Sequence, residues 1–230
     1  MLPTAHFVDR YDAGRRLGAA LRKHATDRPL IVLGLPRGGV PVASCVAEAL
    51  DAPLDIFVVR KLGVPGHEEL ALGAIASGGA RVLNGDIIGQ LGIAPLAIER
   101  VVAEEQRELE RREATYRGTR HFPVLAGETV IVVDDGAATG ASMRVAIIAL
   151  RQLGPRAIIA ALPVASRDSI ITLKTVADEV VCLVAPDPFY GVGLWYKDFS
   201  ETSDVEVRVL LADARRRWET AAPLHAELET

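Results

Sequence analysis

The fold of this chain is decided by one stretch, Val130-Ile131-Val132-Val133-Asp134-Asp135-Gly136-Ala137-Ala138-Thr139-Gly140-Ala141-Ser142. Its first four residues are apolar, which is typical of a strand buried on both faces of a parallel sheet. Two adjacent acids and several small residues follow, and they indicate a loop. Apolar residues then recur with helical spacing up to Gly154-Pro155. The stretch therefore predicts a strand over 129–133, a loop, and a helix over 140–153.

Similar units flank this one on both sides. Apolar runs predict further strands over 30–33, 54–59, 157–162 and 179–184, and Arg60-Lys61 would close the second of these. Helical patterns lie between and around them, over 9–24, from Gly39 to about residue 50, over 166–176 and over 204–218. Strands that alternate with helices indicate an α/β protein with a mostly parallel sheet flanked by helices.

The region over 62–120 interrupts this alternation. Residues 70–76 are apolar and small, and they predict a strand that pairs with Arg81-Val82-Leu83 across Gly78-Gly79. Residues 95–117 form the longest helical pattern, which is dense in Glu and Arg. We interpret these charges as a solvated helix face with pairs such as Glu108 with Arg112, rather than as a nucleic-acid site.

Composition narrows the class of protein. The chain has 230 residues, half of them hydrophobic, which suits a single α/β domain over 1–230. A net charge of −4 makes nucleic acid an unexpected partner. The two cysteines, Cys45 and Cys182, stand far apart and are expected to be reduced thiols. No signal peptide and no apolar run of membrane-spanning length is present, so we expect a cytoplasmic protein with no membrane contact.

Two acids beside a loop of small residues suggest a specific ligand chemistry. Ligands of parallel sheets bind at the carboxyl ends of the strands. Free N–H groups at a helix start favour a phosphate, and the hydroxyls of Thr139 and Ser142 add donors. A ribose 5-phosphate satisfies both features, because its hydroxyls donate to carboxylates while its phosphate binds the loop. The alternative is an ordinary strand–turn–helix in which an Asp caps the helix.

The stretch from Val130 to Ser142 resembles the phosphoribosyl pyrophosphate (PRPP) motif of the type I phosphoribosyltransferases. That resemblance implies that Asp134 and Asp135 are the catalytic residues and hold Mg²⁺ mainly through PRPP and waters. It also implies a 5-phosphate site formed by Gly136, Ala137, Ala138, Thr139, Gly140 and Ser142. Over nearly its full length the chain is similar to a group of small predicted phosphoribosyltransferases.

Two further elements of the family have counterparts here. Arg37 and Gly38 lie in a loop after the first strand, where the family binds pyrophosphate. Arg60 and Lys61 are the basic residues that the resemblance assigns to the same pyrophosphate. Alternatively, they are ordinary charged side chains at a strand end that reach into solvent.

The remaining segments are assigned less directly. The resemblance makes 62–120 an enlarged flexible-loop insertion, in which Glu68 and Glu69 are either proton acceptors or exposed loop carboxylates. It makes 186–230 a small C-terminal hood and tail helix. Tyr190 and Trp195 would contact the acceptor there, or else belong to a small satellite core beneath the tail helix.

The expected activity is transfer of ribose 5-phosphate from PRPP to a nitrogen acceptor, with Mg²⁺ and with release of pyrophosphate. The resemblance implies a nucleobase or related small molecule as acceptor, and a homodimer. Two alternatives remain: a non-catalytic PRPP sensor on the same fold, and a phosphosugar hydrolase or mutase that uses Asp134 as nucleophile.

Overall fold

A five-stranded parallel sheet forms the centre of the computed structural model, which describes residues 6–226. Its strand order is β2-β1-β6-β7-β8, and every neighbouring pair runs parallel. The strands are β1 (Leu30–Gly34), β2 (Leu54–Ile56), β6 (Thr129–Val133), β7 (Ala157–Val164) and β8 (Glu179–Val184). The predicted α/β class is therefore confirmed, including the parallel strand at the decisive stretch.

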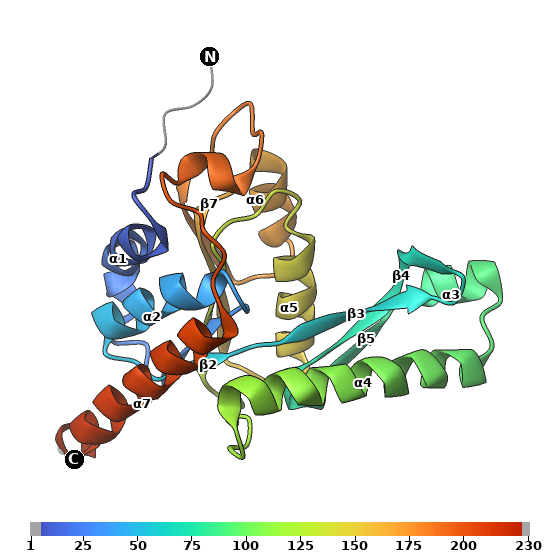
Figure 1. Ribbon diagram of the computed structural model, residues 1–230, viewed down its shortest axis with the longest axis horizontal. Coiled ribbons are helices and arrows are strands. Elements are labelled where there is room, and N and C mark those ends of the chain that lie inside the picture. Colours follow the sequence, from blue (N-terminus) through green and yellow to red (C-terminus); the bar gives the residue numbers. More distant parts are fainter. Residues whose placement is uncertain (1–5, 227–230) are drawn as a thin grey trace.

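Helices cover both faces of this sheet (Figure 1). The helices α1 (Arg10–Leu21), α2 (Gly39–Leu50) and α7 (Asp204–Ala226) share one core cluster with Ile131 of β6. The helices α5 (Ala141–Arg151) and α6 (Arg167–Leu173) share the other with Val130 and Val132. Alternate side chains of a strand point to opposite faces, so one apolar run supplies both clusters. Short 3₁₀ turns lie at Arg22–His24, Ser77–Gly79 and Val192–Trp195.

The register of the sheet places two loops side by side. β6 lies next to β1, and Gly34 at the end of β1 is aligned with Val133 at the end of β6. The loop before α2 and the loop before α5 therefore leave the same edge of the sheet at neighbouring positions. This arrangement brings the loop of Arg37 and Gly38 to the twin aspartates, although about 100 residues separate them in the chain.

An antiparallel arm projects from the central sheet (Figure 1). It consists of β3 (Val59–Val64), β4 (His67–Ala76) and β5 (Arg81–Leu83), followed by α3 (Gly85–Leu91) and α4 (Pro95–Arg117). The predicted hairpin is confirmed, since Ile75 pairs with Arg81 and Gly73 with Leu83. The long predicted helix over 95–117 is confirmed as α4.

The predicted strand over 54–59 is wrong, because the chain changes sheets within it. β2 ends at Ile56, and the backbone N–H of Phe57 makes a last hydrogen bond to Gly34 of β1. The next residue, Val58, pairs instead with Ser77 through its N–H and its carbonyl. Val59 then begins β3, so Arg60 and Lys61 lie within an antiparallel strand rather than at the end of a parallel one.

A buried ion pair connects the arm to the central sheet. Arg117, the last residue of α4, donates through Nε to both carboxylate oxygens of Asp55 in β2, at 3.1 and 3.2 Å. It also donates to the carbonyl of Ile56 and to Glu113. The two paired side chains are only 3% and 10% exposed. This buried, charge-assisted pair anchors the C-terminal end of α4 to β2, at the end of the sheet nearest the site.

The segment around Tyr196 packs against α1 and against the residues just before it. A small cluster of Phe7, Ala13, Val164 and Tyr196 is fully buried or nearly so. The N–H groups of Lys197 and Asp198 donate to the carbonyls of Phe7 and Val8, so the two segments are hydrogen-bonded along their backbones.

Among the described residues, no helix is both long and apolar enough to cross a lipid bilayer.

Candidate active site

Asp134 and Asp135 follow directly after the last residue of β6. The backbone N–H of Asp135 donates to Asp134 Oδ1 at 2.9 Å, which fixes the first carboxylate against the turn. Burial, and then the neighbouring charge of Asp135, raise the pKa of Asp134 well above its ordinary value. Burial also raises the pKa of Asp135, although Arg10 opposes this effect. Such a pair favours a ligand that brings a cation or hydroxyl donors.

The loop from Gly136 to Gly140 is held against β7 and α6. The N–H of Ala137 donates to the carbonyl of Val164, and the hydroxyls of Ser166 and Ser169 both donate to the carbonyl of Ala138 at 2.8 Å. Gly140, with φ +69°, turns the chain directly into α5. Thr139 and Ser142 remain exposed at this start of the helix. The arrangement has the small residues, hydroxyls and helix start of an anion site.

Gly38 leaves space for the carboxylate of Asp135. A Cβ atom at Gly38 would lie 2.0 Å from Asp135 Oδ2, and one at Gly39 would lie 2.6 Å from the carbonyl oxygen of Val133. The Pro36–Arg37 peptide bond in the same loop is cis. Arg37 projects from it and forms ion pairs with Glu201 and, at 3.9 Å, with Asp204. The loop of Arg37 and Gly38 thus lies in direct contact with the aspartates.

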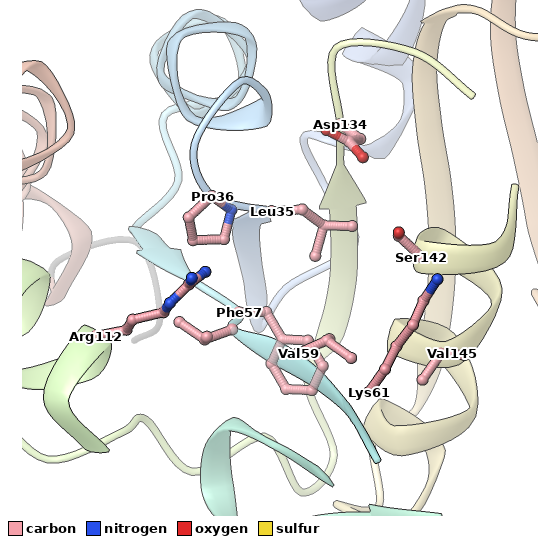
Figure 2. Close-up of a pocket in the computed structure, with 10 residues that line it drawn as sticks. Leu35, Pro36, Phe57, Val59, Lys61, Arg112, Asp134, Ser142 and Val145 are labelled. Atoms are coloured by element: carbon pink, nitrogen blue, oxygen red, sulfur yellow. The ribbon is translucent and has the colours of Figure 1, made fainter. Parts of the chain in front are cut away.

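A central pocket of about 180 Å³ opens beside Asp134. It is lined by Leu35, Pro36, Phe57, Val58, Val59, Lys61, Arg112, Asp134, Ser142 and Val145. Figure 2 shows Lys61 extending toward Ser142, with Arg112 on the opposite side of the pocket. A lysine, an arginine and a carboxylate from three distant parts of the chain therefore surround one cavity.

Arg60 and Lys61 point to different environments, as neighbours on a strand do. Lys61 lines the central pocket, whereas Arg60 donates through Nε to Glu105 of α4 at 2.7 Å. Arg60 is not among the residues that line the pocket. Of the two predicted basic residues, only Lys61 thus lines the pocket beside Asp134.

Tyr190 and Trp195 do not come together in one site. Tyr190 is 64% exposed and lines an open groove with Thr139, Ser166 and Asp187. Trp195 packs against the buried cluster of Phe7 and Tyr196, and its carbonyl accepts from the N–H of Phe7. Trp195 thus belongs to a small satellite core, but this core packs against the start of the chain and includes no described residue of the tail helix. Tyr190 borders the phosphate-type loop.

Two arginines at this site were not predicted as site residues. Arg10 pairs with Asp135, and Arg112 lines the central pocket. Arg112 also donates to Glu108 at 2.8 Å, as predicted from their spacing, but the spacing did not reveal that the same side chain faces a cavity. The side chains of Glu68 and Glu69 lie outside the described part of the structure.

Within residues 6–226, apart from side chains left undescribed, no group of three or more His, Cys, Asp or Glu side chains is arranged to hold a metal ion. The adjacent oxygens of Asp134 and Asp135 match the hard oxygen ligands that Mg²⁺ prefers. Mg²⁺ commonly binds one or two carboxylates together with phosphate oxygens and waters. The residues present thus fit a Mg²⁺ ion that arrives with a phosphorylated ligand.

Replacing Gly38 by alanine is expected to displace the Asp135 carboxylate and to break its pair with Arg10. The new Cβ would overlap Asp135 Oδ2, and overpacking of this kind costs about 1–3 kcal/mol of stability. Thermal unfolding and a crystal structure of the variant would measure both effects. Gly89→Ala in α3 is the control, since no atom lies within 4 Å of its new Cβ. An unmoved Asp135 in the Gly38→Ala structure would contradict the close packing.

The chain is similar to several known proteins. A family model described as "Phosphoribosyl transferase domain" matches residues 8–195. The "Putative phosphoribosyl transferase Rv0571c" of Mycobacterium tuberculosis strain H37Rv is 43% identical over 220 residues, which are 96% of this chain and 49% of that protein. The chain thus spans about half the length of the curated relatives it matches, including "Putative phosphoribosyl transferase MT0597" of strain CDC 1551.

A solved structure shares the fold over most of both chains. The crystal structure of TT1426 from Thermus thermophilus is 42% identical, with a TM-score of 0.79. The similarity covers 90% of this chain and 98% of that one.

Proposed function

Since this chain belongs to the phosphoribosyl transferase domain family, we propose that it transfers ribose 5-phosphate from PRPP to a nitrogen acceptor and releases pyrophosphate. One observation carries the proposal. The carboxylates that directly follow β6 lie between a loop with the features of a phosphate site and a pocket lined by Lys61 and Arg112. PRPP has hydroxyls between a monophosphate and a pyrophosphate, in the same order.

The ribose 5-phosphate half binds at the β6–α5 connection in this proposal. Asp134 and Asp135 accept hydrogen bonds from the ribose hydroxyls. The backbone of Gly136, Ala137, Ala138, Thr139 and Gly140, with the hydroxyls of Thr139 and Ser142, binds the 5-phosphate. The support is geometric: Thr139 and Ser142 are exposed, and Gly140 directs the chain into the N-terminus of α5.

The pyrophosphate half binds toward the central pocket. Arg37 and the backbone at Gly38 approach it from the first loop, Lys61 from β3 and Arg112 from α4. Arg37 and Arg112 both line a second, polar cavity, and Pro36 and Arg112 line both this cavity and the central pocket, so the basic side chains border neighbouring cavities. Arginine and lysine are the usual partners of phosphate oxygens. We leave Arg60 out of this group, because it lines neither of these two cavities and is paired with Glu105 of α4.

Positioning and electrostatics supply the rate in this mechanism, without a covalent intermediate on the protein. The bond from C1 of the ribose to the pyrophosphate oxygen breaks, and its electron pair leaves with pyrophosphate. The acceptor nitrogen forms the new bond to C1 and loses a proton. Lys61, Arg37 and Arg112 offset the negative charge that grows on the leaving group. When bound, Mg²⁺ supplies further neutralisation of that charge.

The acceptor is a small molecule, and a nucleobase or related compound suits the family. The open groove bordered by Tyr190 and Thr139 is the proposed place for it, since an exposed aromatic ring can stack on a planar base. Trp195 supports the segment that carries Tyr190 in this proposal. We also propose a cytoplasmic homodimer and a single domain over 1–230, the latter because one core cluster includes residues of both the arm and the central sheet.

The test of this function is release of pyrophosphate from PRPP and Mg²⁺ in the presence of purines, pyrimidines and small amines. The proposal expects release that depends on one class of acceptor and on the metal. Tight PRPP binding without release for any acceptor would favour the non-catalytic sensor. Hydrolysis of simple phosphate esters without use of PRPP would favour the hydrolase alternative instead.

Lys61 and Arg60 offer a matched pair of substitutions. Lys61→Met is expected to weaken the binding of pyrophosphate and PRPP by about tenfold or more, because a charge-assisted hydrogen bond contributes about 1.5–3 kcal/mol. Arg60→Met, on the adjacent residue of the same strand, is expected to leave both affinities nearly unchanged. Isothermal titration measures the two variants side by side. An equal loss in both, or a loss in Arg60→Met alone, would contradict the assignment.

A further inference from the structure

Arg10 is held at the edge of the site by the start of α1. The side chain of Asp9 accepts a hydrogen bond from the N–H of Asp12 at 2.7 Å, which caps the helix and makes Arg10 its first residue. From there Arg10 Nε reaches Asp135 Oδ2 at 2.8 Å. The two side chains are only 11% and 15% exposed, so solvent screens this pair weakly.

Two more contacts fix the guanidinium group of Arg10. It stacks over the ring of Phe199, 3.9 Å from the ring centroid, and Nη1 donates to the carbonyl of Ser200 at 2.6 Å. The planar guanidinium therefore meets an aromatic face, a carbonyl and a carboxylate at once. A lysine at this position lacks the fork and the plane that these three contacts use.

Asp135 is held from its backbone side as well. The hydroxyl of Tyr196 donates to the carbonyl of Asp135 at 2.6 Å, and Tyr196 is 5% exposed. Tyr196, Phe199 and Ser200 belong to one short segment after the last strand. This segment thus fixes the backbone carbonyl of Asp135 directly, through Tyr196, and its carboxylate indirectly, through Arg10.

We propose that Arg10 is a positioning residue, which holds the Asp135 carboxylate in the orientation that accepts a ribose hydroxyl and offsets its charge beside Asp134. The inference rests on the proposed function, because it needs a ribose ligand at the aspartates. It assigns a role to the segment of Tyr196, Phe199 and Ser200: this segment orders the sugar site through Arg10 of the N-terminal helix. Arg10 itself makes no contact with pyrophosphate in this account.

Three probes separate this role from others: PRPP with Mg²⁺, ribose 5-phosphate, and pyrophosphate. Arg10→Met is expected to weaken the two ribose ligands by about tenfold or more, the effect of losing one charged hydrogen bond, and to leave pyrophosphate within about twofold. Arg10→Lys is expected to recover part of the loss, since it restores the charge alone. Isothermal titration at a temperature where circular dichroism shows every variant folded gives these values.

The control is Arg16→Met on the same helix. Arg16 also pairs with an acid, Asp12, and lies over an aromatic ring, Phe7, but it does not contact the aspartates of the site. This variant should bind all three probes as the wild type does. If Arg10→Met does not fold, Arg10→Lys and Arg10→Gln carry the comparison.

The outcomes are distinguishable. An equal loss for pyrophosphate and for the ribose ligands in Arg10→Met, or unchanged affinity for all three, would overturn the positioning role while the proposed function stands. A wild-type protein that binds pyrophosphate but neither ribose ligand would remove the proposed function, and the role of Arg10 with it.

Discussion

Replacing both Asp134 and Asp135 by asparagine is expected to reduce the affinity for PRPP with Mg²⁺ by at least about 100-fold. Each carboxylate contributes a charge-assisted hydrogen bond to a ribose hydroxyl, and two such bonds contribute about 3–6 kcal/mol. Asparagine has nearly the same shape, so the fold should be kept. Isothermal titration measures the affinity, and circular dichroism checks the fold.

The control for this double variant is Asp86→Asn, which removes an exposed acid in the first turn of α3, on the arm and away from the twin aspartates. It should bind PRPP as the wild type does. Undiminished, Mg²⁺-dependent PRPP affinity in the double variant would remove the aspartates from the site.

Substitution of Asp134 by asparagine should stabilise the unliganded protein, although loss of the carboxylates weakens PRPP binding. Burial and Asp135 raise the folded-state pKa of Asp134 above that of the unfolded chain. A raised acid pKa means that stability is lost as the pH rises through it, because ionisation is less favourable in the folded state. An asparagine side chain in place of Asp134 keeps an oxygen for the N–H of Asp135 and carries no charge. Asp134→Asn should therefore unfold at a higher temperature than the wild type at pH 8, with a smaller difference at pH 4.

Arg117→Leu is expected to destabilise the protein by about 3–5 kcal/mol, because it leaves the carboxylate of Asp55 buried without its partner. Burial raises the pKa of Asp55 even with Arg117 in place, which indicates how poorly this position is hydrated. For a chain of this size such a loss lowers the unfolding midpoint by about 6–20 °C. Urea and thermal unfolding would measure it.

Arg111→Leu on the same helix is the control for Arg117→Leu. Arg111 pairs with Glu108 at an exposed position, so this variant should unfold nearly as the wild type does. A second comparison isolates the unpaired charge. Asp55→Leu combined with Arg117→Leu should be more stable than Arg117→Leu alone, since both charges are then gone. Nearly wild-type stability of Arg117→Leu would contradict the anchoring of α4.

The strand–loop–helix unit around Asp134 was predictable because its signals are local. Four apolar residues, two acids and a glycine before a helical pattern all lie within thirteen residues, and the structure has β6 and α5 where the pattern predicts them. The hairpin over β4 and β5 was predictable for the same reason, from the glycines between two apolar runs. Family resemblance then added roles for these residues that the pattern alone does not carry.

The change of sheet at Phe57 could not be predicted from hydrophobicity. Residues 54–59 are almost uniformly apolar, and an apolar run does not reveal which strand it pairs with. The opposite directions of Arg60 and Lys61 follow from the period of two in any strand, once both are known to lie within β3. The sequence pattern places both residues at the end of a parallel strand, where the alternation of side chains does not separate them.

Arg10 was missed because its partner is remote. It lies 125 residues from Asp135, and nothing in its surroundings distinguishes it from Arg15 or Arg16 on the same helix. The place of Arg112 in the pocket was not predicted, because its spacing from Glu108 already explained its charge as part of a helix-surface pair. Long-range packing decides both positions, and a single sequence does not encode such contacts in a local pattern.

The most direct test is a crystal structure of the protein with PRPP and Mg²⁺. The account predicts the ribose hydroxyls on Asp134 and Asp135, the 5-phosphate on the backbone of 136–140 beside Thr139, and the pyrophosphate toward Lys61. A 5-phosphate bound elsewhere, or a ribose that does not touch either aspartate, would contradict it.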